Sequence, residues 1–162
     1  MGTAITKRSQ IDVAQVRAAV EAAERQTSAE IVVALSPFFF GNVMSAAHRA
    51  FRKLGVARTR QRNGVLIFVV PRRRQVVVLA DEGALVAAPG TLWSELAADI
   101  AAACGRGAGT DGLVAAIARL GRELAAAFPC PADDVNELPD APRVVRGRGL
   151  RAGPRTARRS PS

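Results

Sequence analysis

The stretch RNGVLIFVVPRRRQVVVLADEG, residues 62–83, decides the fold of this chain. It contains two runs of β-branched residues, Val65–Val70 and Val76–Leu79, which are joined by a proline and an Arg-rich turn. Such runs are typical of buried strands, and a short connection forces the two strands to pair antiparallel. We therefore predict a buried β-hairpin whose far end carries the adjacent carboxylates Asp81 and Glu82.

Helical and extended patterns surround this hairpin. Apolar residues at helical spacing predict helices over residues 9–26, 43–54, 91–104 and 110–128, and AEIVVAL predicts a strand over residues 29–35. Ser9 or Asp12, Asn42 and Thr91 are candidate N-caps. A helix between the first two strands is typical of a parallel crossover, so the order favours a three-layer α/β/α sandwich with a small mixed β-sheet.

The expected organisation is one domain followed by a basic tail. A chain of 162 residues can bury one core but is too short to make two ordinary domains. The formal net charge is +9, and seven arginines follow Asp140 without an acid, which leaves only +2 for the rest. We predict a folded domain over residues 9–140 and a disordered Arg-rich tail over 141–162. Such a tail is expected to contact polyanions or anionic lipids non-specifically.

Cysteine usage and hydropathy exclude two classes of protein. Cys104 and Cys130 are too few for a disulfide scaffold and form no CxxC pair, so reduced thiols are expected. No apolar run approaches the roughly 20 residues that span a bilayer, and the N-terminus lacks the apolar core of a signal peptide. We expect a cytoplasmic protein without a transmembrane segment.

The predicted topology brings scattered polar residues together at one end of the sheet. The starts of the first two strands and the end of the third share that end, which carries Glu30, Asn63 and Asp81. Carboxylate and amide oxygens suit a hard cation, so one hypothesis is a Ca²⁺ or Mg²⁺ site formed by these three residues. In the alternative, Glu30 pairs with Arg62, and Asp81 accepts backbone N–H groups in a turn.

Arginines and aromatics provide candidate contacts to anions or partners. Arg72, Arg73 and Arg74 could bind a phosphate or an anionic head group, or could simply be solvated turn charges. Three phenylalanines at residues 38–40 cannot all be buried in an extended loop, so either they form an exposed patch or the loop folds over the sheet end. The resulting anion or partner candidates are Arg62, Arg72, Arg73, Arg74 and Phe39.

Motifs spread along the chain resemble those of a known family. In order they are TSAEIVV at 27–33, FRKLGV at 51–56, RNGVLI at 62–67, DEG at 81–83, GLVAAI at 112–117 and DDVNELPD at 133–140. The set resembles the short, soluble branch of the TPM-domain family, which has no membrane anchor. The resemblance implies an α/β/α sandwich, and it associates the chain with divalent metal binding and acid-phosphatase activity.

Two function classes follow. The first is a non-catalytic module that binds a divalent cation or an unidentified protein partner, and the alternative is a metal-dependent acid phosphatase acting on phosphomonoesters. The sequence has no DxDxT, CxxxxxR, RHG or HxH motif, and its single histidine, His48, is expected on a helix surface rather than as a general base. These observations favour the binding module and leave the enzyme question open.

Overall fold

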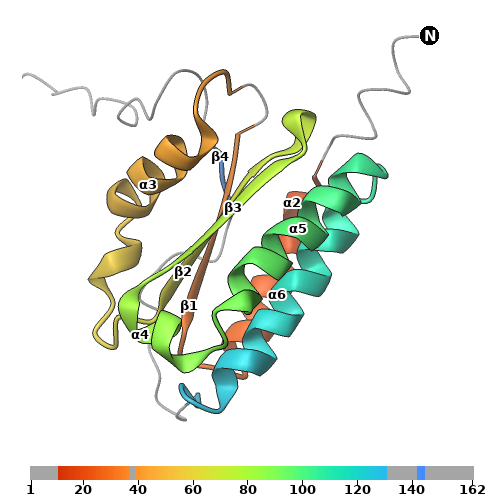
Figure 1. The fold of residues 1–162 in the computed structure, drawn as a ribbon. Helices are drawn as coiled ribbons and strands as arrows, with labels where there is room; N and C mark the ends of the chain where they lie inside the picture. Colours follow the sequence, from red (N-terminus) through yellow and green to blue (C-terminus); the bar gives the residue numbers. More distant parts are fainter. Residues whose placement is uncertain (1–10, 37–38, 131–141, 145–162) are drawn as a thin grey trace, which may run out of the picture.

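A β-sheet lies between helices on both of its faces (Figure 1). The computed structural model describes residues 11–36, 39–130 and 142–144. One face is covered by α2 (Val13–Glu24), α5 (Thr91–Gly105) and α6 (Gly109–Ala125), and the other by α3 (Val43–Lys53). The predicted α/β/α sandwich is therefore confirmed.

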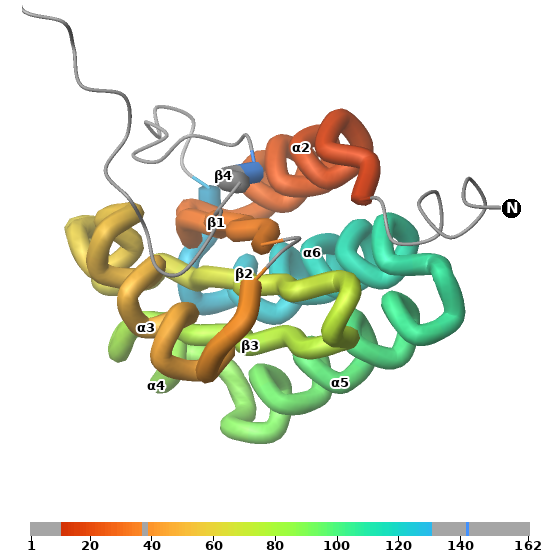
Figure 2. The backbone as a smooth tube through the Cα atoms, turned by 90° about the horizontal axis from the view of Figure 1, so that it is seen from above, coloured from red at the N-terminus to blue at the C-terminus, as the bar shows by residue number. Residues whose placement is uncertain are grey.

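The sheet is mixed, as the sequence predicts. Its strands are β1 (Glu30–Leu35), β2 (Gly64–Val70), β3 (Gln75–Ala80) and β4 (Arg143–Val144), in the order β3-β2-β1-β4 (Figure 2). β1 runs parallel to both β2 and β4, whereas β2 and β3 form the predicted antiparallel hairpin. A short 3₁₀ turn, η1 (Val56–Arg58), precedes β2, and a second one, η2 (Pro71–Arg73), connects β2 to β3.

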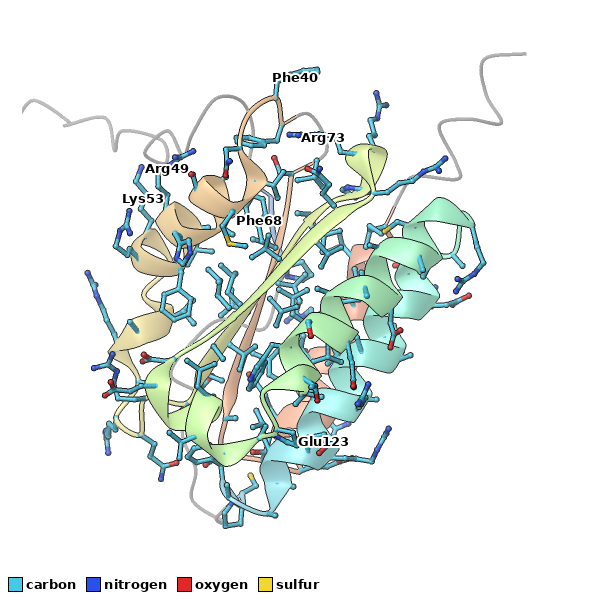
Figure 3. The ribbon with its side chains drawn as sticks, in the orientation of Figure 1. Phe40, Arg49, Lys53, Phe68, Arg73 and Glu123 are labelled. Carbon is cyan, nitrogen blue, oxygen red and sulfur yellow. The ribbon has the colours of Figure 1, made fainter. Side chains whose placement is uncertain are left out.

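The two central strands are buried on both faces. Alternate residues such as Ile31 and Ile67 pack beneath α2, α5 and α6, while Val32 and Phe68 pack beneath α3. Figure 3 shows Phe68 between the sheet and α3. This two-sided burial explains why the strands read as continuous apolar runs rather than as alternating ones.

Helix ends mostly follow the sequence signals. Asp12 caps α2 by accepting from the backbone N–H groups of Ala14 and Gln15 at 3.0 and 3.2 Å, and Asn42 caps α3. The prediction for Thr91 is wrong, because this residue lies inside α5 and the N-cap position is Gly90. A short helix that the patterns did not predict, α4 (Glu82–Ala87), follows β3 directly.

The prediction of a folded domain over residues 9–140 and a tail over 141–162 stays a prediction, but two residues beyond 140 belong to the sheet. Arg143 and Val144 pair in parallel with Ala34 and Leu35, so the tail region contributes a short strand to the sheet. The physical reason is that the outer edge of β1 otherwise leaves backbone groups unpaired. The DDVNELPD segment and residues 145–162, on which the predicted tail disorder rests, lie outside the described residues.

Within the described ranges, no helix has both the length and the apolar character that crossing a bilayer requires.

Candidate functional site at the polar end of the sheet

The structure brings the predicted site residues to one end of the sheet. Glu30 lies opposite Gly64 in the parallel pair, and the Asp81 backbone N–H donates to the Gly64 carbonyl at 2.9 Å. The side chains of Glu30, Asn63 and Asp81 belong to residues only 4, 2 and 6% exposed. With two further buried residues, they form what we call the polar end: Thr27, Glu30, Thr59, Asn63 and Asp81.

Asp81 is held by Arg62. The guanidinium donates from Nε to Oδ2 at 2.5 Å and from Nη2 to Oδ1 at 2.8 Å, and the Glu82 backbone N–H donates to Oδ1 at 2.9 Å. The Arg62 hydrogen bonds lower the pKa of the Asp81 carboxyl below its ordinary value; burial opposes this effect, and the Glu82 N–H adds to it. Arg62, which the alternative assigned to Glu30, thus binds Asp81, and Asp81 accepts a backbone N–H as that alternative expected.

Asn63 acts as a connector between segments. Its backbone N–H donates to Thr59 Oγ1 at 3.1 Å, and its side-chain Nδ2 donates to the Ser28 carbonyl at 3.2 Å and to Gln61 Oε1 at 3.1 Å. The bond to Ser28 thus ties the loop before β2 to the segment that leads into β1, and the bond to Gln61 lies within the loop itself. Asn63 supports the polar end whether or not an ion binds there.

Thr27 also connects two segments of the chain, just before β1. Its hydroxyl donates to the Phe128 carbonyl at 2.6 Å and accepts from the Ala29 N–H at 3.2 Å. The residues just after α6 are fixed to the start of the sheet in this way.

A backbone segment separates the two predicted carboxylate ligands. Glu30, Gly64 and Asp81 are cross-strand partners, so their side-chain positions face the same side of the sheet. A Cβ on Gly64 would come within 2.2 Å of the Val56 carbonyl oxygen, which shows that η1 lies directly over this glycine. The Val56 backbone therefore occupies the space between the positions of Glu30 and Asp81.

The donor set can be compared with the needs of a cation. Carboxylates, an amide and a carbonyl are the ligand types that Ca²⁺ and Mg²⁺ use. Among the described residues, however, no three His, Cys, Asp or Glu side chains gather closely enough to hold a metal, and the Asp81 oxygens already bind a guanidinium. The chemistry of the donors fits a hard cation, but the ion would have to replace Arg62.

The opposite end of the sheet carries the turn arginines. Arg73 Nη1 donates to the Gly41 carbonyl at 2.7 Å and more weakly to the Phe39 carbonyl at 3.4 Å. Arg72 and Arg74 are exposed, and Arg74 ends the turn with a left-handed φ of 52°. Of the three turn arginines, Arg73 thus clamps the loop before α3.

The prediction that Phe39 is an exposed partner residue is wrong. Phe39 is 4% exposed and packs edge-on against Phe68, with ring centroids 6.4 Å apart. The neighbouring Phe40 is 77% exposed and points away from the molecule in Figure 3. Successive side chains point in opposite directions, which buries one ring over the sheet end and exposes the next.

His48 is exposed on α3, as expected.

Comparison with known proteins identifies the family. A family model described as the TPM domain matches residues 9–123. This chain belongs to the TPM-domain family. Its fold is similar to the NMR structure of the BA42 protein from the psychrophilic bacterium Bizionia argentinensis, with a TM-score of 0.74 and 29% identity over 83% of this chain and 94% of BA42. No curated protein matches the chain.

Proposed function

We propose that this TPM domain is a non-catalytic binding module. The observation that carries the proposal is the bidentate pair between Asp81 and Arg62. A carboxylate whose pKa is lowered by a guanidinium is a weak base at neutral pH, so it is poorly suited to proton transfer. The hydrogen bonds of Thr27, Asn63 and Asp81 join separate segments of the fold to one another.

A divalent cation, Ca²⁺ or Mg²⁺, is the candidate ligand at the polar end. The oxygen chemistry of Asp81, Glu30 and Asn63 supports this proposal, and the Arg62 side chain is 48% exposed, so it can leave Asp81 for water. In this proposal Arg62 and the ion compete for the same carboxylate.

Calorimetric titration with Ca²⁺ and with Mg²⁺ tests this competition. Arg62→Gln should bind the ion about tenfold more tightly than the wild type because its competitor is gone, whereas Asp81→Asn should lose binding. Arg17→Gln is the matched control, since Arg17 pairs with Glu21 on α2 away from the polar end. If Arg62→Gln bound neither ion better than Arg17→Gln did, the cation proposal would be refuted.

The second candidate is a metal-dependent acid phosphatase acting on phosphomonoesters. It is supported by the activity associated with the family, and it requires the same ion because the sequence has no phosphatase nucleophile motif. Hydrolysis of p-nitrophenyl phosphate should be measured with each ion and with a chelator. Activity that disappears both with the chelator and in Asp81→Asn would replace the non-catalytic proposal.

The arginines near the C-terminal end of the sequence are candidates for a second kind of contact. We propose that the arginines after Asp140 bind polyanions or anionic lipids, which is supported by their charge. Heparin retention should fall steeply with salt and should largely vanish in a chain that ends at Asp140.

A cytoplasmic location is also proposed and is supported by two cysteines that are not joined in a disulfide. Recovery of the protein in a membrane or secreted fraction would contradict it.

A further inference from the structure

The free edge of the sheet presents unused backbone groups. β3 is the edge strand, and the bond from the Asp81 N–H to the Gly64 carbonyl sets the alternation of its pairing with β2. The backbone N–H and C=O groups of residues 75, 77 and 79 therefore point toward β2, and those of the residues between them point away from the sheet. The residues whose backbone groups point away from the sheet are Val76, Val78 and Ala80. Within the described part of the chain, their outward N–H and C=O groups make no hydrogen bond.

An open groove of about 570 Å³ runs along the start of this edge. Residues 75–77 form its floor, Met44 on α3 lines one wall, and Ala97, Ala98 and Ala101 on α5 line the other. Figure 2 shows the end of the sheet at β3 with α3 and α5 on either side. The alanines have short side chains, so they leave room beside β3 for an added strand, which needs a spacing of about 4.8 Å.

The charge of the groove selects the chemistry of its occupant. Arg73 and Arg74 lie at the end where β3 begins, and none of the described residues that line the groove is acidic. Arg74 forms no ion pair with any described residue. The 11-residue α3 also begins at this end, so the positive end of its dipole adds to the two arginines.

We propose that the β3 edge binds an extended acidic peptide as an added antiparallel strand. Antiparallel pairing places the C-terminal end of the peptide beside Arg73 and Arg74, where its carboxylates meet positive charge, while its backbone pairs with Val76 and Val78. This inference rests on the proposed binding function, in its partner-binding form, and does not involve the polar end. An acidic peptide is favoured over a second copy because it supplies the negative charge that the groove itself lacks.

Fluorescence anisotropy with a designed peptide tests the proposal on the full-length chain. The probe is an N-terminally labelled hexapeptide, Thr-Val-Thr-Val-Asp-Asp, with a free C-terminal carboxylate. Two further probes carry N-methyl groups on alternate residues, one set on each edge of the extended peptide. Strand addition predicts that methylation of one edge weakens binding about tenfold and that methylation of the other leaves it unchanged, because only one edge faces β3. Non-specific attraction of the probe to the C-terminal arginines would be changed by neither methylation pattern.

Two substitutions on the same helix provide the protein side of the test. Ala98→Glu places a negative charge in the groove and should weaken binding about tenfold. Ala102→Glu is the matched control, since Ala102 is exposed but lines a different cleft beside α6 and should leave binding within about twofold. Val78→Pro removes an outward N–H without touching the ladder to β2 and should act like Ala98→Glu.

Three results would overturn the proposal. The first is no binding of the unmodified probe, and the second is binding that ignores both methylation patterns. The third is a dimer of the wild type, seen by sedimentation, that Ala98→Glu dissociates while the probe never binds, which would assign the edge to a second copy. None of these results bears on Asp81-dependent cation binding or hydrolysis, so failure here is distinguishable from failure of the non-catalytic proposal.

Discussion

The two ends of the sheet treat their polar groups in opposite ways. At the polar end, Asp81, Asn63 and Thr27 are buried and bonded to other parts of the same chain. At the end where β3 begins, the outward backbone groups of Val76 and Val78 and the charge of Arg74 find no partner among the described residues. The comparison shows that the buried and bonded side chains of Thr27, Asn63 and Asp81 mark a structural junction. Unused hydrogen-bonding groups lie instead in the backbone of the edge strand β3.

The largest expected effect tests how tightly the polar end is packed. Gly64→Ala should destabilise the fold by about 3 kcal/mol, because the new methyl group would collide with the Val56 carbonyl. Gly90→Ala is the control, since nothing lies within 4 Å of its Cβ position, and it should change stability by less than about 0.5 kcal/mol. Urea denaturation measures both. Equal stability of the two variants would show that η1 does not press on β2.

The second test concerns the charge at the polar end. Asp81→Asn keeps an acceptor that can cap α4 but removes the ion pair with Arg62, so we expect a loss of about 1–2 kcal/mol at pH 7. The folded-state pKa of Asp81 lies below its ordinary value of 3.8, so the stabilisation is present above that pH and is lost as the pH falls through the folded-state pKa.

Urea denaturation at pH 7 and at pH 3 measures this dependence. The gap between wild type and Asp81→Asn should narrow at the lower pH. Asp111→Asn, at an exposed acid in the first turn of α6, is the control. A gap that stayed constant with pH, or that matched the control, would mean that the ion pair contributes nothing to folding.

The third test concerns the closed edge of the sheet, beside β1. A chain that ends at Asp140 should fold cooperatively but should be about 1 kcal/mol less stable than one that ends at Arg146, because it lacks the bonds between β4 and β1. Thermal unfolding of the two chains gives the comparison. Identical midpoints would show that β4 adds no stability, and a chain that fails to fold would show that β4 is indispensable.

The smallest expected effect lies beside the groove. Arg73→Ala removes the donor that binds the carbonyls of Gly41 and Phe39 and should cost about 0.5 kcal/mol, since the contact is mostly exposed. Faster amide hydrogen exchange around residues 39–42 would reveal the loosened loop. Arg52→Ala, at an exposed arginine near the end of α3, should leave that exchange unchanged.

The first three strands and their relative directions were accessible from the sequence for a simple physical reason. Layers that cover both faces of a sheet require continuous apolar strands, and Val65–Val70 is such a run. Once the crossover was taken as parallel, strand direction alone placed Glu30 and Asp81 at the same end.

Contacts that depend on loops were not accessible. Either carboxylate could have bound Arg62, and the choice depends on the left-handed backbone of Arg62, with a φ of 52°, and on α4. The six residues of α4 are too few to show a helical period. Two residues of β4 likewise carry no pattern. One signal was available and was not used: a glycine at the start of a buried strand, Gly64, is typical of a close backbone approach.

The late position of β4 in the chain has a consequence for synthesis on the ribosome. β1 ends at Leu35, but the strand that pairs with its outer edge begins only at Arg143. At about 5–20 residues per second, roughly 5–20 s of translation separate the two segments. During this interval, a nascent chain that has already paired β1 with β2 still exposes the outer edge of β1. Translation speed through α5 and α6 therefore sets how long that strand is open to pairing with neighbouring nascent chains.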